Sequence, residues 1–230
     1  MLEIYGIEHI LYLLVTIPFF VGSIYLIKKH VKTQEGMRMA MRVVGVVYLL
    51  ILIWNRISTS MLENGWDHFL PDLYCGTSGI AMSLTLIFLK RDHIVLHCII
   101  YISTLGGLLT MIYPDFIVHA DSLFYLPTIS GMIHHSLLLF IPFLLVYTGY
   151  VKPDLNKYYV LPVGMAVYIT FGVFEITVLG YADAMYLFTP ALPGSMFNWF
   201  GFALIFLPTH LAFLIVWKYL PHRFKPKSVY

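Results

Sequence analysis

Four side chains that could do chemistry together lie inside long apolar runs of this sequence: Cys75, His134, His135 and Glu175. A thiol becomes a strong nucleophile only when another group removes its proton. A neutral imidazole beside Cys75 would serve as that base, and Glu175 could orient the imidazole. Because helix neighbours diverge by about 100°, only one histidine can point straight at the thiol. These residues predict transfer of an acyl group through a cysteine thioester to an alcohol or to water.

A second set of polar residues could hold a substrate beside the thiol: Asn55, Arg56, Asp72, Tyr113 and Asn198. Arg56 would supply a fixed positive charge suited to a lipid phosphate. Tyr113 and Asn198, together with Tyr74, are candidate donors to an oxyanion. We therefore expect the substrate to be a membrane phospholipid or lysophospholipid.

The composition is that of a membrane protein. The 230 residues are 60% hydrophobic and 11% charged, whereas a soluble domain carries about 25% charged residues. The net charge of +2 is uninformative, and we expect no nucleic-acid partner and no cofactor. Cys75 and Cys98 lie in different apolar runs without a paired motif.

Seven apolar runs are each long enough to cross the roughly 30 Å hydrocarbon core of a bilayer as a helix. They are Glu8–Ile27, Met39–Ser58, Phe69–Leu89, His93–Ile112, Leu126–Tyr150, Tyr158–Gly180 and Ser195–Trp217. The first run follows acidic residues and lacks a small-residue cleavage site, so we expect a retained helix and not a signal peptide. The sequence predicts an all-α polytopic protein with a single domain over residues 1–230.

Charged residues divide between the two sides of this topology. Most basic residues lie on one side: Lys28, Lys29, Lys32, Arg38, Lys90, Arg91, Lys152, Lys157, Lys218, Arg223, Lys225 and Lys227. Acidic residues occupy the other: Glu3, Glu63, Asp67, Asp115, Asp121 and Asp183. Because basic residues are retained in the cytoplasm, we expect an outside N-terminus, a cytoplasmic C-terminus and a multi-pass protein of the cell membrane.

The topology brings the polar residues to a similar depth. At about 1.5 Å per residue, Cys75 falls in the first two turns of its span, and the two histidines lie roughly 12 Å below the start of theirs. Glu175 lies roughly 8 Å from the outer end of its span, and Arg56 closes the second span on that side. This predicts a site in the outer half of the bilayer.

Small and polar residues recur on one face of the third span. They are Asp72, Cys75, Gly76, Gly79 and Ser83, at three- and four-residue steps. Such a stripe would face the other helices. Close helix packing alone would also explain its glycines and serine, and a lone buried cysteine is usually inert.

Several short motifs between residues 66 and 217 resemble those of the YwaF-like integral membrane family. They are Leu70-Pro71-Asp72-Leu73-Tyr74-Cys75, Gly106-Gly107, Tyr113-Pro114-Asp115-Phe116, the fifth-span histidine, Gly180-Tyr181, Met185-Tyr186-Leu187-Phe188 and Pro190. Animal relatives of that family are ether-phospholipid-remodelling acyltransferases, and a more distant likeness is to the androgen-induced-gene family of fatty-acid-ester hydrolases. The resemblance implies a catalytic pair of Cys75 and His135, with His134 as the alternative.

The sequence departs from that family at three positions. Leu73 and Gly76 stand where family members often carry a histidine and an aspartate, and Glu175 stands at a position that looks like a family asparagine. These departures leave open acyl transfer, acyl-ester hydrolysis or a different activity.

Two rival interpretations remain. His93 and His97 have the four-residue spacing of zinc ligands, and His210 could approach them, which would suit a zinc-dependent lipid hydrolase. Alternatively, the polar residues form the pocket of a small transporter or sensor, with Glu175 and Arg56 as an ion pair or proton site.

Overall fold

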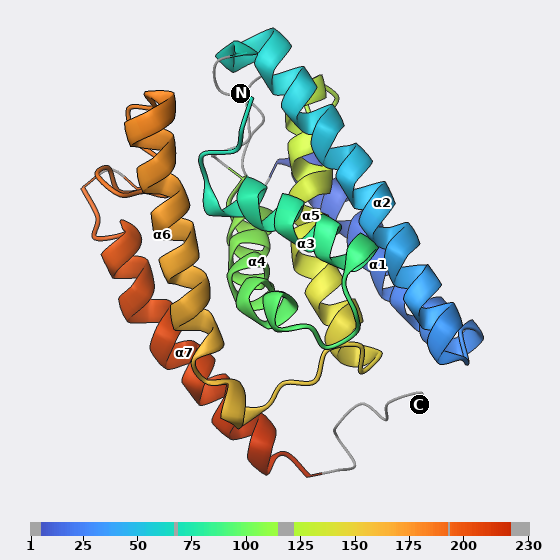
Figure 1. The fold of residues 1–230 in the computed structure, drawn as a ribbon. Coiled ribbons are helices and arrows are strands. Elements are labelled where there is room, and N and C mark those ends of the chain that lie inside the picture. The colour runs from blue at the N-terminus through green and yellow to red at the C-terminus, as the bar shows by residue number, and fades with distance from the viewer. Residues whose placement is uncertain (1–5, 67–68, 115–121, 193, 222–230) are drawn as a thin grey trace.

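The computed structural model describes residues 6–66, 69–114, 122–192 and 194–221 (Figure 1). Several residues used in the predictions lie outside these ranges: Glu3, Asp67, Asp115, Phe116, Asp121, Arg223, Lys225 and Lys227.

The described residues form seven α-helices and contain no strand. The helices are α1 (Ile7–His30), α2 (Gln34–Thr59), α3 (Tyr74–Phe88), α4 (Ile94–Ile112), α5 (Leu126–Tyr147), α6 (Val160–Leu179) and α7 (Trp199–Tyr219). A π-helical turn, η1 (Ser60–Asn64), extends α2, and a 3-10 turn, η4 (Leu155–Lys157), precedes α6. All of these helices except α3 are long and apolar enough to cross a membrane. The predicted all-α membrane fold is confirmed.

The third helix is shorter than predicted, because it begins at Tyr74 and not at Phe69. Pro71 restricts the residue before it to extended conformations. The carbonyl groups of Pro71 and Asp72 accept hydrogen bonds from Thr77 Oγ1 at 3.0 Å and from the Met185 N–H at 2.7 Å. Asp72 therefore precedes the helix and does not belong to its predicted polar stripe. With 15 residues, α3 is about 22 Å long, and it crosses the bundle at a large angle (Figure 1).

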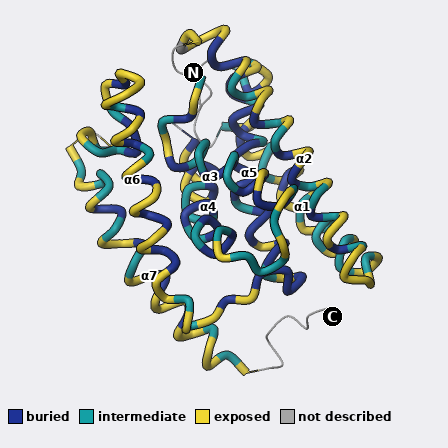
Figure 2. The backbone as a smooth tube through the Cα atoms, in the orientation of Figure 1, coloured by how far each residue is buried: buried dark blue, intermediate teal, exposed yellow. Residues whose placement is uncertain are grey.

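Two large apolar cores hold most of the helices together, and a small third cluster around Leu123 and Met132 packs against Tyr12 of α1. The first lies among α2, α3, α4 and α5 and includes Tyr48, Leu52 and Met82. The second joins the start of α3 to α4, α6 and α7 and includes Tyr74 and Phe202. Figure 2 shows buried residues concentrated around α3, α4 and α5. Large apolar side chains are exposed along α1, α6 and α7, as expected for contact with lipid, where a helix satisfies its own backbone groups.

Candidate functional site

A cavity of about 480 Å³ lies between the two cores. Its wall includes seven of the nine predicted site residues: Asn55, Arg56, Asp72, Cys75, Tyr113, His134 and His135. These residues come from α2, the segment before α3, α3 itself, the end of α4, and α5. The structure thus brings together a thiol, two imidazoles and a guanidinium that are far apart in the sequence.

Glycines allow three helices to approach closely around the thiol and the imidazoles. A Cβ atom placed on Gly106 of α4 would lie 2.9 Å from Cys75 Sγ. One placed on Gly79 of α3 would lie 3.0 Å from His134 Cε1, and one on Gly107 would lie 2.8 Å from the carbonyl oxygen of His135. The thiol of α3 therefore rests directly against α4, which in turn packs against α5 at the level of the histidines.

Hydrogen bonds distinguish the two histidines. His135 Nδ1 lies 2.8 Å from the carbonyl oxygen of Gly131. Because a carbonyl only accepts, Nδ1 carries the proton, and Nε2 of the neutral ring is left as a proton acceptor. His134 Nδ1 lies 3.0 Å from the Tyr48 hydroxyl, and either group can donate in that pair. The tautomer of His135 is the one that a general base acting through Nε2 requires.

The thiol and the imidazoles line the same cavity, but the described residues show no hydrogen bond between them. Among the described residues, no hydrogen bond joins Cys75 to His134 or His135, and the two imidazole centroids are 4.6 Å apart. Catalytic hydrogen bonds often form only when substrate is bound. The structure shows a shared cavity wall but no direct hydrogen bond between the thiol and the described imidazoles.

Two predicted site residues are not on the cavity wall. Glu175 is fully buried on α6, and neither carboxylate oxygen has a hydrogen-bond partner among the described residues. It therefore neither orients an imidazole nor pairs with Arg56 in this structure. Asn198 Oδ1 accepts a hydrogen bond from the Gly201 N–H at 3.0 Å and caps α7, so its side chain serves the helix start instead of an oxyanion.

The predicted binding residues surround one polar end of the cavity. Asn55 Nδ2 donates to Ser130 Oγ at 3.0 Å. Arg56 Nε is buried and has no hydrogen-bond partner, and Arg56 makes no ion pair among the described residues. The Asp72 carboxylate on the same cavity wall attracts Arg56 without a hydrogen bond to it, and the guanidinium beside the cavity is suited to bind an anion there. Tyr74 also lines the cavity, with its hydroxyl buried and unpaired within the described part of the chain.

The cavity changes from polar to apolar along α4. Its α4 wall runs from Ile102 to Tyr113, which is about 16 Å at 1.5 Å per residue. Thr110 and Tyr113 lie at the helix end, whereas Ile102 lies deeper, where Phe206 of α7 also lines the wall. Gly106, against which the thiol rests, lies between these ends.

Sequence reasoning missed two aromatic residues of this site. Tyr48 is a fully buried polar residue within an apolar run, one turn from Leu52 on the cavity wall, and its position in that run was a usable signal. Tyr186 lines the cavity from the connection between α6 and α7. It was noted only as part of a motif, because no local pattern reveals where such a connection folds.

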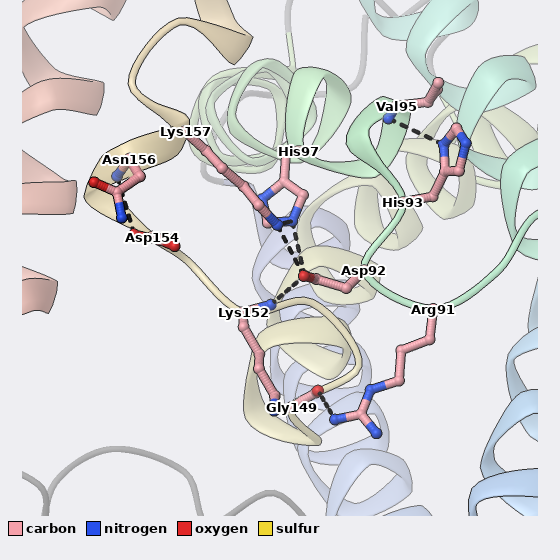
Figure 3. Close-up of polar contacts among 10 residues, drawn as sticks. All are labelled: Arg91, Asp92, His93, Val95, His97, Gly149, Lys152, Asp154, Asn156 and Lys157. Atoms are coloured by element: carbon pink, nitrogen blue, oxygen red, sulfur yellow. Dashed lines mark hydrogen bonds and ion pairs between the residues drawn. The ribbon is translucent and has the colours of Figure 1, made fainter.

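Two of the histidines considered as zinc ligands, His93 and His97, have other partners, whereas His210 Nε2 is buried without a hydrogen-bond partner in the described part of the chain. His93 Nδ1 accepts a hydrogen bond from the Val95 N–H at 3.3 Å at the start of α4. His97 Nε2 lies 2.8 Å from Asp92 Oδ1 and 2.7 Å from Lys157 Nζ (Figure 3). Within the ranges that the structure describes, no three histidine, cysteine or acidic side chains are grouped to hold a metal ion.

Asp92 is the centre of this second polar cluster. Its carboxylate accepts hydrogen bonds from His97, from Lys157 Nζ at 2.8 Å and from the Lys152 N–H at 2.9 Å (Figure 3). Burial raises the pKa of Asp92, but the hydrogen bonds from His97, Lys157 and Lys152 outweigh it and hold the pKa below its ordinary value. The cluster fastens the turn before α4 to the segment before α6.

Comparison with known proteins identifies the family of the chain. A search of curated proteins and a search of solved structures each found no match. The sequence matches the TMEM164 family over residues 4–220, which includes all seven helices and every residue of the cavity wall. The chain belongs to the TMEM164 family of membrane proteins.

Proposed function

We propose that the protein is a membrane-embedded lipid acyltransferase that uses Cys75 as its nucleophile and His135 as its general base. The observation that carries the proposal is the shared cavity, whose wall holds the thiol, both imidazoles and the Arg56 guanidinium inside an apolar helical bundle. Lone buried cysteines and histidines are common, but their meeting in one cavity with an anion-binding group suits acyl transfer.

The proposed reaction uses the acceptor nitrogen of His135. Nε2 takes the proton of the Cys75 thiol, and the sulfur attacks the carbonyl carbon of a lipid ester. The ester C–O bond then breaks, the acyl group remains on sulfur as a thioester, and the imidazolium returns its proton to the departing alcohol. An acceptor alcohol next gives its proton to Nε2 and attacks the thioester, which releases the acylated product and the thiol.

The polarity of the cavity supports a glycerolipid as substrate. A phosphate would bind Arg56 at the polar end, and the acyl chain would lie against Ile102 and Phe206. The ester linkage, which joins headgroup to chain, would then lie beside Gly106 and the thiol. With the N-terminus outside, as the basic loops indicate, this polar end faces the outer leaflet.

A lipid-like electrophile tests the pairing of thiol and base. Purified protein is treated with an acyl-chain maleimide at neutral pH, and labelled cysteines are identified by peptide mass. We expect Cys75 to react, Cys98 outside the cavity to react far more slowly, and His135→Ala to slow the labelling of Cys75 in protein that still unfolds cooperatively. Equal labelling of both cysteines, or no effect of the substitution, would overturn the proposed pair.

The acceptor is tested separately by following the released products. Incubation with a phospholipid and a lysophospholipid should give acyl exchange that Cys75→Ser abolishes. Release of free fatty acid alone would make the protein an acyl-ester hydrolase. Lipid binding without any turnover would make the cavity that of a transporter or sensor.

A further inference from the structure

The connection between α6 and α7 contains an unusual stretch of backbone beside the cavity. Met185 and Tyr186 both adopt the left-handed conformation, with φ of 52° and 53°. Glycine adopts this conformation without strain, whereas larger residues do so only when their surroundings hold them there. Two such residues in succession must therefore be held in place by the contacts around them.

Asp183 holds this stretch in its conformation. Its carboxylate accepts hydrogen bonds from the N–H groups of Ala184, Leu187, Phe188 and Thr189 and from the Thr189 hydroxyl. Burial raises the pKa of Asp183, but the bonds from Thr189, Phe188 and Ala184 lower it below its ordinary value. The carboxylate is therefore ionised at neutral pH, and the backbone of residues 184–189 folds around it.

Backbone contacts then fasten the stretch to both sides of the cavity. The Met185 N–H donates to the carbonyl oxygen of Asp72 at 2.7 Å, three residues before Cys75, and Tyr186 accepts from the Trp199 N–H at 3.0 Å at the start of α7. The Met185 side chain is fully buried against Gly172 of α6. These bonds fix the loop relative to the thiol.

Tyr186 lines the cavity, as do Ala191, Leu192 and Phe197 farther along the same connection. The centroid of the Tyr186 ring lies 5.7 Å from that of Phe202 and 6.4 Å from that of Tyr74, the residue next to Cys75. Burial raises the pKa of the Tyr186 phenol, and negative charge at Cys75, Asp72 or Asp183 acts in the same direction. The ring is thus a neutral, rigidly held wall close to the sulfur.

We propose that Tyr186, held in place by Asp183, limits how bulky an acyl group can be next to the carbonyl that Cys75 attacks. The inference rests on the proposed function. Tyr186 is a specificity-determining residue, and Asp183 is a positioning residue that acts through it.

Paired esters test this limit. The probes are a straight-chain p-nitrophenyl ester and its isomer branched at the carbon next to the carbonyl, and the readouts are the p-nitrophenolate burst and the acyl mass on Cys75. We expect Tyr186→Ala to raise the branched-to-straight rate ratio about tenfold, because pocket contacts of methyl size discriminate by about that much. Tyr186→Phe should keep the wild-type ratio, since the ring remains.

Two further variants distinguish a limit on acyl-group bulk set by Tyr186 from a general effect on the fold. Phe188→Ala changes an exposed ring on the same loop and should leave the ratio unchanged. Asp183→Asn places an amide N–H group against the donors of Thr189, so it should raise the ratio in the same direction as Tyr186→Ala. This rise in the ratio must be seen in Asp183→Asn protein whose thermal unfolding is still cooperative.

The outcomes distinguish this inference from the function on which it rests. If wild-type Cys75 is acylated but Tyr186→Ala keeps the wild-type ratio, the limit is overturned while the acyl-transfer proposal stands. If no ester acylates wild-type Cys75, both are overturned. A rise in the ratio for Phe188→Ala as large as that for Tyr186→Ala would also reject the limit.

Discussion

Replacing Gly106 by alanine should disable the thiol without disturbing the fold. The added Cβ would lie 2.9 Å from Cys75 Sγ, whereas unstrained contacts between such atoms are about 3.5–4.0 Å. The sulfur must therefore retreat by roughly 0.6–1 Å, and it can do so by turning its single side-chain bond. A displacement of about 1 Å at a reacting atom can slow chemistry about a hundredfold.

The neighbouring Gly107 provides a matched control. An alanine Cβ there would lie 2.6 Å from the Leu139 nitrogen and 2.8 Å from the His135 carbonyl oxygen. Both are backbone atoms, so α4 and α5 would have to separate, at a cost of about 1–3 kcal/mol typical of overpacking. Gly106→Ala instead gains up to about 1 kcal/mol of helix propensity.

The assay compares turnover and stability in the two variants. The p-nitrophenolate burst measures acylation, and thermal unfolding in detergent measures stability. We expect Gly106→Ala to lose about a hundredfold in burst rate at an unchanged or higher melting temperature, and Gly107→Ala to melt at a lower temperature. A Gly106→Ala protein with the wild-type burst rate would refute the placement of the reacting sulfur against α4.

Three further predictions follow from the contacts of single residues. Arg56→Gln should raise the KM for a phospholipid about 10- to 100-fold, as expected for a lost charge-assisted hydrogen bond. The KM for a p-nitrophenyl ester, which has no phosphate, should stay unchanged. Equal effects on the two KM values would exclude a phosphate site at Arg56. Tyr48→Phe should lower stability by about 1–3 kcal/mol in thermal unfolding, because it leaves the buried His134 Nδ1 unpaired; an unchanged melting temperature would argue against that hydrogen bond. Because the folded pKa of Asp92 is depressed, the stability advantage of the wild type over Asp92→Asn should be present above about pH 4 and be lost as the pH falls further. An advantage that instead grew in acid would contradict the ion-pair network.

Much of the fold could be predicted because apolar runs set the length of spanning helices. The exception was α3, where Pro71 was counted inside a span although it prevents the helix from starting before it. Depth along the spans also placed Arg56 and Asn55 at the level of the thiol, because the rise per residue is fixed. Both line the cavity in the structure.

The direction in which each side chain points could not be predicted in the same way. Helix α6 is apolar on every side, so nothing in its sequence indicated that Glu175 would lie away from the cavity wall. The capping role of Asn198 depends on α7 beginning at Trp199, which the predicted start at Ser195 missed. Tyr186 depends on hydrogen bonds to Asp183 within an irregular connection, which no periodic pattern encodes.

Intact mass of the protein after brief exposure to an activated acyl ester tests the central claim most directly. We predict one added acyl group, located on Cys75 by peptide mass, removed by neutral hydroxylamine as a thioester must be, and missing from Cys75→Ser protein that still unfolds cooperatively. An acyl group on another residue, or turnover that persists in Cys75→Ser, would contradict the account.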